Sequence, residues 1–208
     1  MDNKLTPLSC EFLARLIHPK ANTNLQILKL DHNDIGSKGL EYLAEGMAIN
    51  KTVTSLSLTY CNIDEGGARA LFEMMIFTQS NLEELNLSGN LLRNDGLIAL
   101  LKGVSINKKL SHLLLADNQF NEDDSVLDAI RSCFIKNQKL GHYDFRYNTL
   151  ENYGVEKITS FLEEATWVSN VEISERISRE TLELFKERLA LNKPKKGKKG
   201  KKGKKKKK

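Results

Sequence analysis

The side chains of this sequence that could bind a metal or transfer a proton lie far apart along the chain. His142 follows His112 by 30 residues, and His112 follows Glu84 by 28 residues. If these residues occupy equivalent places on neighbouring strands, successive side chains lie about 4.8 Å apart and the ends of the row about 10 Å apart. One metal ion with ligands at about 2 Å cannot be shared across that row. We therefore expect a solvated polar strip and no metal site.

Nucleophile and phosphate-binding motifs are also missing from the sequence. The GKKGKK runs near the end lack the preceding strand and the following hydroxyl residue of a phosphate-binding loop, and no G-x-S-x-G is present. The three cysteines, Cys10, Cys61 and Cys133, are widely spaced, form no CxxC pair and are not placed beside a histidine. This pattern is typical of reduced thiols in the cytosol or nucleus. We expect no enzyme activity and no cofactor.

The elements that would position these side chains come from an internal repeat. The repeats start at Leu25, Val53, Leu82, Leu110, Leu140 and, in degenerate form, Val168, with spacings of 28, 29, 28, 30 and 28 residues. Typical copies read LQILKLDHNDIGSKGLEYL, VTSLSLTYCNIDEGGARAL and LEELNLSGNLLRNDGLIAL. Their first, fourth and sixth positions are apolar, and the ninth is Asn33, Cys61, Asn90, Asn118 or Asn148. A regular period of this length indicates a stack of similar units.

Each repeat is expected to form one strand, one sharp turn and one helix. The apolar positions are buried on a short strand, and the asparagine side chain satisfies backbone groups inside the turn. Cys61 takes the asparagine position and is therefore expected to be structural. After the turn, apolar residues three and four apart predict a helix packed on the strand. Since one such unit cannot bury both of its faces, neighbouring units must stack with parallel strands.

The LxxLxLxxN pattern and its 28 to 29 residue period resemble the leucine-rich repeats of the ribonuclease-inhibitor type, over residues 25 to about 175. The resemblance implies an α/β fold, a leucine-rich repeat solenoid with a curved parallel sheet on the concave side and helices on the convex side. About five full repeats and two helical caps are expected. The family presents its concave surface to other macromolecules, and this implies binding rather than catalysis.

Four segments are predicted along the chain. Residues 1–24 contain an N-terminal capping helix, with Leu8, Phe12, Leu13, Leu16 and Ile17 as its apolar stripe over the first strand. Residues 25–175 form the solenoid, 176–192 a C-terminal capping helix and 193–208 a disordered Lys/Gly tail. The C-terminal cap carries an apolar stripe of Leu182, Phe185 and Leu189. Two extra residues within NEDDS, 121–125, predict a protruding acidic loop.

The outward-facing strand positions predict a protein-binding concave face. Interface-forming aromatic and charged residues collect there, together with one apolar residue in a polar field: Asp31, Tyr60, His112, Leu114, His142, Asp144, Arg146 and Tyr147. The alternative is an ordinary hydrated sheet face with scattered aromatic residues. Carboxylates on this face disfavour nucleic acid there.

The charge of the chain is divided unevenly. Of 32 basic and 27 acidic residues, 12 lysines and no acids lie within 193–208, which leaves 20 basic and 27 acidic residues in the remainder. The tail is therefore expected to bind a polyanion, through Lys195, Lys196, Lys198, Lys199, Lys201, Lys202, Lys204 and Lys205. The acidic tails of tubulin and RNA both qualify, and the choice between them stays open. Neither a lipidation signal nor a sufficiently long apolar run is present, so we expect no membrane insertion.

Three functions are compatible with these features. The first is a non-enzymatic scaffold or adaptor in a cytoskeletal or ciliary assembly, since small repeat proteins of this type occur in axonemes. The alternatives are a nuclear or RNA-associated adaptor and, less well supported, a regulator of small GTPases. We expect a cytoplasmic protein, cytoskeletal or ciliary with the nucleus as the alternative, that is monomeric outside its complex.

Overall fold

The fold is described from a computed structural model, which covers residues 3–21, 24–77 and 79–193. The lysines predicted to bind a polyanion, at positions 195–205, lie outside the described residues. Within the described ranges, no helix combines the length and the apolar character needed to cross a membrane.

Strands and helices alternate along the chain. The strands are β1 (Ile27–Lys29), β2 (Ser55–Ser57), β3 (Glu84–Asn86), β4 (His112–Leu114), β5 (His142–Asp144) and β6 (Asn170–Glu172). The α-helices are α1 (Pro7–Ile17), α2 (Gly36–Ile49), α3 (Ala68–Ile76), α4 (Arg93–Ile106), α5 (Asp124–Lys136), α6 (Asn152–Glu164) and α7 (Arg179–Asn192). Short 3-10 helices cover Pro19–Ala21 and Glu65–Gly67.

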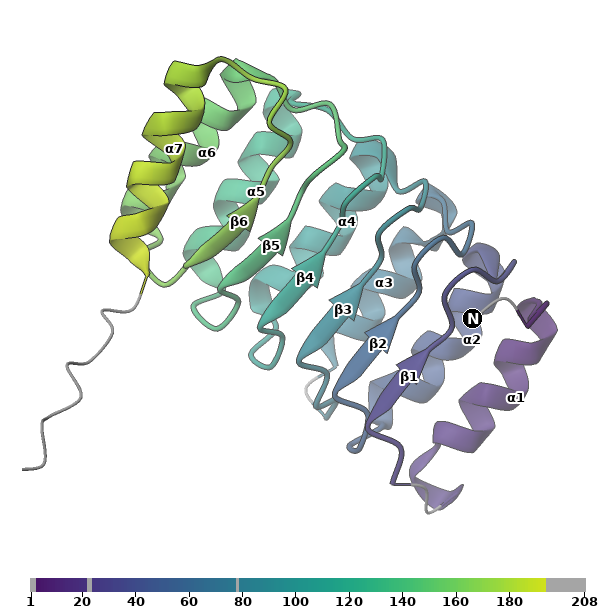
Figure 1. Cartoon of the computed structure of the whole chain (residues 1–208). Helices are drawn as coiled ribbons and strands as arrows, with labels where there is room; N and C mark the ends of the chain where they lie inside the picture. Colours follow the sequence, from purple (N-terminus) through teal and green to yellow (C-terminus); the bar gives the residue numbers. More distant parts are fainter. Residues whose placement is uncertain (1–2, 22–23, 78, 194–208) are drawn as a thin grey trace, which may run out of the picture.

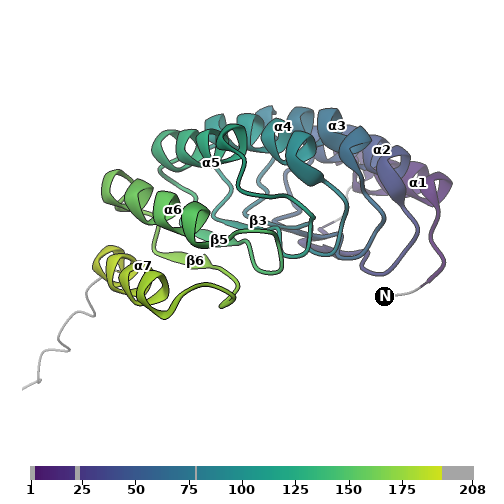
Figure 2. The same cartoon turned by 90° about the horizontal axis from the view of Figure 1, so that it is seen from above.

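The strands form one parallel sheet in the order β1-β2-β3-β4-β5-β6. The sheet is open and curved, with the strands along the inner side and the helices along the outer side of the arc (Figures 1 and 2). Neighbouring strands pair residue for residue, as in Glu84 with His112 and His112 with His142. This register confirms the predicted solenoid and the predicted rows of equivalent residues.

The core is built from the apolar positions of the repeat. In the second repeat, Val53, Leu56 and Leu58 are fully buried under the helices. Asn90 holds the next turn together, because its Nδ2 donates to the carbonyls of Leu58 at 2.8 Å and Leu87 at 2.7 Å. The predicted role of the asparagine position is therefore confirmed.

The capping helices differ in how well their predicted stripes match. Phe185 and Leu189 of α7 are buried and Leu182 is partly buried, as expected. In α1, however, Leu8 and Phe12 are exposed, and the helix packs through Cys10 and Ile17. The buried face of α1 lies against α2 rather than over the first strand, because α1 continues the helix layer of the stack.

The acidic segment 121–125 is tied to its neighbours rather than protruding as a free loop. The Oε2 atom of Glu122 accepts hydrogen bonds from the amides of Glu151 at 2.7 Å and Gly154 at 2.8 Å. Those amides begin α6, where unpaired N–H groups favour an anionic partner. The two extra residues thus bring a carboxylate onto the start of the next helix.

Candidate functional site

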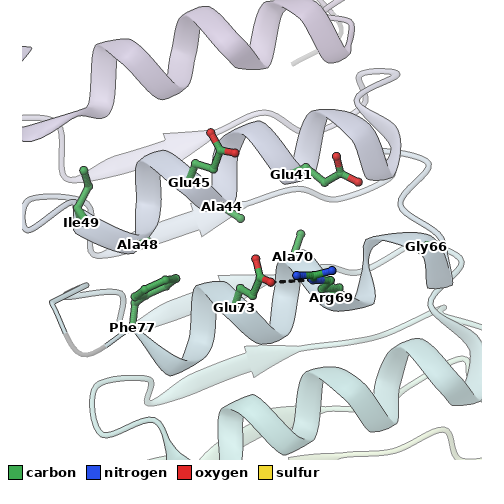
Figure 3. A pocket seen from close by; sticks show the side chains of 10 residues that line it. All are labelled: Glu41, Ala44, Glu45, Ala48, Ile49, Gly66, Arg69, Ala70, Glu73 and Phe77. Atoms are coloured by element: carbon green, nitrogen blue, oxygen red, sulfur yellow. Dashed lines mark hydrogen bonds and ion pairs between the residues drawn. The ribbon is translucent and has the colours of Figure 1, made fainter.

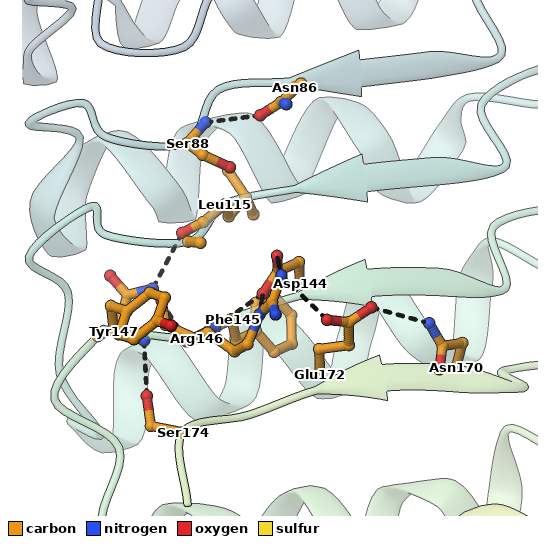
Figure 4. A network of polar contacts seen from close by, with 12 residues as sticks. Asn86, Ser88, Leu115, Asp144, Phe145, Arg146, Tyr147, Asn170, Glu172 and Ser174 are labelled. Carbon is orange, nitrogen blue, oxygen red and sulfur yellow. Dashed lines mark hydrogen bonds and ion pairs between the residues drawn. The ribbon is translucent and has the colours of Figure 1, made fainter.

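A network of charged side chains crosses β5 and β6 on the concave face (Figure 4). The Arg146 guanidinium donates to both carboxylate oxygens of Asp144, at 3.0 and 2.7 Å, and lies 3.0 Å from Glu172 Oε2. Hydrogen bonding to Asp144 raises the pKa of Arg146 above its ordinary value. This bidentate pairing holds the guanidinium in one orientation, half-exposed to solvent.

The residues at the eighth position of the repeats form a row just beyond the ends of the strands. His32, Tyr60, Gly89, Asp117 and Tyr147 occupy it, and all have left-handed backbones with φ between 51° and 72°. We call these five residues the rim. The shared conformation recurs at equivalent places in successive repeats, and four of the five residues carry a side chain there.

Tyr60 is held across the rim by its neighbours. Its ring stacks on His32 with the centroids 5.2 Å apart, and its hydroxyl donates to Asp117 Oδ2 at 3.3 Å. A side chain at Gly89 would collide with the ring, because an added β-carbon would lie 2.3 Å from it. The negative charge of Asp117 raises the pKa of the Tyr60 phenol. The ring is therefore oriented before any partner arrives, with 50% of the residue exposed.

Tyr147 is the most exposed aromatic residue of the predicted site, at 70%. Its amide donates to the Ser174 hydroxyl at 2.6 Å, whereas the amides of Tyr60 and Asp117 donate to backbone carbonyls of the next repeat. Its backbone is fixed while its ring stands free in solvent. Tyrosine is one of the residue types that most often anchor protein interfaces.

The paired histidines lie where the register predicted. The rings of His112 and His142 are 4.2 Å apart, edge to face, on neighbouring strands. Leu114, at the end of β4, is partly exposed on the same face. Within the described ranges, no three His, Cys, Asp or Glu side chains are placed to share a metal ion.

Two predicted contact residues are buried instead of exposed. Asp31 is 8% exposed, and its Oδ1 atom accepts from the Ser57 hydroxyl at 2.5 Å and the Thr59 amide at 2.9 Å. Asp144 is 5% exposed and is bound to Arg146. Both carboxylates are already paired within the chain, so these residues support the concave face without presenting free carboxylates on it.

The cysteine thiols are inert in the folded chain. All three are buried and free. Burial raises the pKa of Cys10 and Cys61 to about 11 and that of Cys133 to about 12. A thiol with such a pKa is almost fully protonated at neutral pH and is a poor nucleophile.

A separate cavity lies on the convex side, between α2 and α3 (Figure 3). It has a volume of about 600 Å³. Alanines 44, 48 and 70 form its floor, and Glu45, Glu73 and Phe77 stand around it. Glu73 is paired with Arg69 at 2.8 Å. Its lining follows the whole of α3, from Gly66 just before the helix to Phe77 just after it.

Gly89 and Ser174 occupy outward-facing positions of the concave face, but they were not predicted to take part in the site. A glycine at the eighth position, where the other repeats carry side chains, is the sequence signal that points to Gly89. No signal identifies Ser174, since serine is common at the ends of strands.

Comparison with known proteins places the chain in a family. A family model described as Leucine Rich repeat matches residues 21–44, 50–72 and 78–101. The chain is 34% identical over 101 residues to the ribonuclease inhibitor of Mus musculus, covering 48% of this chain and 22% of that protein. It is 31% identical over 156 residues to NACHT, LRR and PYD domains-containing protein 12 of Mus musculus, covering 71% of this chain and 14% of that protein. The chain therefore spans about a fifth or less of the length of these relatives.

Two solved structures have a similar fold. One is the leiomodin-1 actin-binding site 2, with a TM-score of 0.53 and 14% identity, covering 86% of each chain. The other is the tropomodulin C-terminal domain of Caenorhabditis elegans, with a TM-score of 0.52 and 20% identity, covering 89% of this chain and 92% of that one. The matched repeats, together with the ribonuclease inhibitor and the NACHT, LRR and PYD relatives, show that the chain is a leucine-rich repeat protein of the ribonuclease-inhibitor-like type.

Proposed function

We propose that this protein is a non-enzymatic scaffold or adaptor in a cytoskeletal or ciliary assembly. A protein partner binds the concave face, and the Lys/Gly tail tethers the molecule to an acidic surface. The observation that carries the proposal is the rim, where Tyr60 and Tyr147 are exposed on a fixed backbone.

The rim suits a protein partner because the Tyr60 ring is already oriented and the Tyr147 ring is presented on a fixed backbone. Tyr60 is positioned by His32, Gly89 and Asp117, so little side-chain entropy is lost when a partner packs on it. Arg146 stands beside Tyr147 and is held by Asp144. These three residues, Tyr60, Tyr147 and Arg146, form the contact set that we propose for the concave face.

The chemistry of the tail supports an acidic tether. Its lysines would bind a polyanion through counterion release, with an affinity that falls steeply with salt. The acidic tails of tubulin fit this description. The similar fold of the leiomodin-1 actin-binding site 2 makes actin filaments a second cytoskeletal polymer to compare.

Cosedimentation tests the proposal directly. The full chain and a chain ending at Asn192 are spun with stabilised microtubules, with actin filaments and with structured RNA, each at low and at physiological salt. Binding to one cytoskeletal polymer that persists at physiological salt and survives in part without the tail is the expected result. Equal binding to all the polymers through the tail alone contradicts a specific cytoskeletal role, and preference for RNA supports the nuclear or RNA-associated alternative.

The concave face is tested with matched tyrosine variants. Tyr60→Ala combined with Tyr147→Ala should weaken the tail-independent binding by about a hundredfold or more, since buried interface tyrosines carry about 2 kcal/mol each. Tyr153→Ala is the control, because Tyr153 is similarly exposed but lies on α6 and contacts Asp124. Equal effects of the rim and control variants contradict the assignment of the rim.

A further inference from the structure

The last strand of the sheet has an open edge. In every pair of neighbouring strands, the first residue after one strand donates its amide to the next strand, as Leu30 does to Ser57 O at 2.9 Å and Phe145 to Glu172 O at 2.8 Å. The third residue does the same in most repeats, as His32 does to Thr59 O at 2.8 Å. In β6 the equivalent amides belong to Ile173 and Glu175.

These two amides have no hydrogen-bond partner among the described residues, and neither has the carbonyl of Ser169. The equivalent carbonyl in the first repeat, that of Gln26, accepts from Thr54 at 2.8 Å and Ser55 at 3.1 Å. The outer side of β6 therefore presents two donors and an acceptor at the spacing that an added strand uses. Unpaired edges of this kind are templates for further strand pairing.

A groove runs beside this edge. It has a volume of about 670 Å³ and lies between β6 and α7. Its apolar wall consists of Val171, Ile173, Leu182, Phe185 and Leu189. A second cavity, of about 400 Å³, adjoins it through the shared residues Tyr147, Ser174 and Arg176. The edge, the groove and the exposed Tyr147 thus form one continuous surface at the C-terminal end of the sheet.

The groove carries unneutralised positive charge. Arg146 is paired with Asp144 and Glu172, and Lys186 lies 3.3 Å from Glu175. Arg176 and Lys193, which also line the groove, have no ion-pair partner in the described part of the chain. The sequence that follows Lys193 adds 11 lysines and no acid. The complementary ligand is therefore acidic.

We propose that the open edge of β6 binds an extended acidic segment of a protein partner, which adds to the sheet as a further strand. The segment's backbone pairs with Ile173, Glu175 and Ser169. Its successive side chains point alternately toward the apolar groove and toward the unpaired cations. Apolar side chains enter the groove beside Leu182, and acidic side chains reach Arg176 and Lys193. This inference rests on the proposed function and deepens it. It states that the partner segment bound at the C-terminal end of the sheet is acidic.

Peptide binding to the full chain tests the proposal. The probe is a fluorescein-labelled peptide of four Glu-Val repeats, followed by fluorescence anisotropy at physiological salt to suppress simple attraction to the tail. The comparison peptides are a Lys-Val peptide of equal length and a Glu-Val peptide N-methylated at alternate residues. N-methylation keeps the charge and removes the N–H groups, so it should weaken binding at least tenfold. The Lys-Val peptide should not bind, and equal binding of methylated and unmethylated Glu-Val peptides overturns strand addition.

Matched variants locate the site. Glu175→Pro removes one edge amide, and Glu175→Ala removes only the carboxylate. The proline variant should bind the peptide about fivefold more weakly than the alanine variant, the equivalent of one hydrogen bond of about 1 kcal/mol. Arg176→Glu should weaken binding about tenfold, whereas Arg69→Glu, a remote and highly exposed arginine on α3, should change it by less than about twofold.

Amide hydrogen exchange gives a readout that does not depend on how well a variant folds. When the peptide binds, the amides of Ile173 and Glu175 should become protected in NMR spectra of the unaltered chain. Perturbation confined to the tail lysines overturns the edge site. Cosedimentation that is retained by the Arg176→Glu chain and lost with the rim tyrosines would show that the edge site has failed while the proposed function stands.

Discussion

The phenol ring of Tyr60 lies across the α-carbon of Gly89, at a distance that leaves no room for a side chain there. The glycine also has a left-handed backbone, with φ of 72°. Position 89 thus combines a backbone requirement with a packing requirement, and the second one orients an exposed aromatic ring. The contact between Gly89 and Tyr60 can therefore be tested by a substitution at position 89.

Gly89→Ala should displace Tyr60 and destabilise the chain by about 2–3 kcal/mol, the sum of left-handed strain and steric overlap. Gly36→Ala is the matched control. Its φ is 61°, but the nearest atom to an added β-carbon is 4.0 Å away. It should cost only about 1 kcal/mol, the strain alone. Urea unfolding measures both, and equal losses would show that the Tyr60 contact adds nothing.

The asparagine position predicts a stabilising substitution. Asn90 Oδ1 accepts the amides of Cys61 at 3.1 Å and Ile63 at 3.0 Å in the preceding repeat. Cys61 cannot do the same for the first repeat, and the amide of Asn33 has no partner among the described residues. Cys61→Asn should therefore raise the free energy of unfolding by about 1 kcal/mol.

The reciprocal variant is the control for this prediction. Asn90→Cys removes buried hydrogen bonds to the carbonyls of Leu58 and Leu87, and it should lower the free energy of unfolding by about 2–4 kcal/mol. Thermal and urea unfolding measure both changes. A loss of stability in Cys61→Asn would mean that the first turn is packed around the smaller thiol and has no space for the asparagine side chain.

The paired histidines predict a pH dependence of stability. Burial, followed by the positive charge of His112, lowers the pKa of His142 below its ordinary value, and Glu172 opposes the shift. The unfolded chain therefore takes up this proton at a higher pH than the folded chain. Stability should be full above about pH 6.5 and should fall as the pH drops through that value toward the folded pKa.

The imidazole resonances of His142 measure this effect. His112→Asn should raise the pKa of His142 by removing the neighbouring charge, and His142→Asn should flatten the stability profile between about pH 7.5 and pH 5.5. An unchanged profile in His142→Asn would assign the acid sensitivity to other groups.

The cysteine thiols should be unreactive until the chain unfolds. Because burial raises the pKa of all three thiols to about 11 or 12, native protein should react with a disulfide reagent only at the rate of global opening. Denaturant should expose three thiols per chain. Rapid reaction of one thiol in native protein would contradict its placement in the core.

Much of this architecture follows from residue types at fixed spacing. The rows through Glu84, His112 and His142 pair as predicted, since a parallel sheet of nearly equal repeats leaves little freedom of register. The burial of Asp31 could not be predicted in the same way. It depends on the Ser57 hydroxyl and the Thr59 amide of the next repeat, and strand alternation carries no information about such contacts.

The orientation of α1 shows another limit of prediction. Its sequence holds apolar residues on more than one face, and periodicity alone does not tell which face meets α2. Cys10 and Ile17 are buried because the small Gly46 on α2 lets the backbone of α1 approach near Ala14, whose α-carbon would lie 3.0 Å from an added β-carbon. Close backbone contact between α1 and α2 determines which face is buried, and Leu8 and Phe12 remain exposed.

The asparagine contacts run in one direction along the chain. Asn90 completes the turn of the repeat before it, through Cys61 and Ile63, and Asn148 accepts the amide of Asn118 in the same sense. During synthesis on the ribosome, a turn therefore acquires its last hydrogen bonds only when the following repeat has emerged. Each repeat of this solenoid therefore completes its folding only after the next repeat has been synthesised.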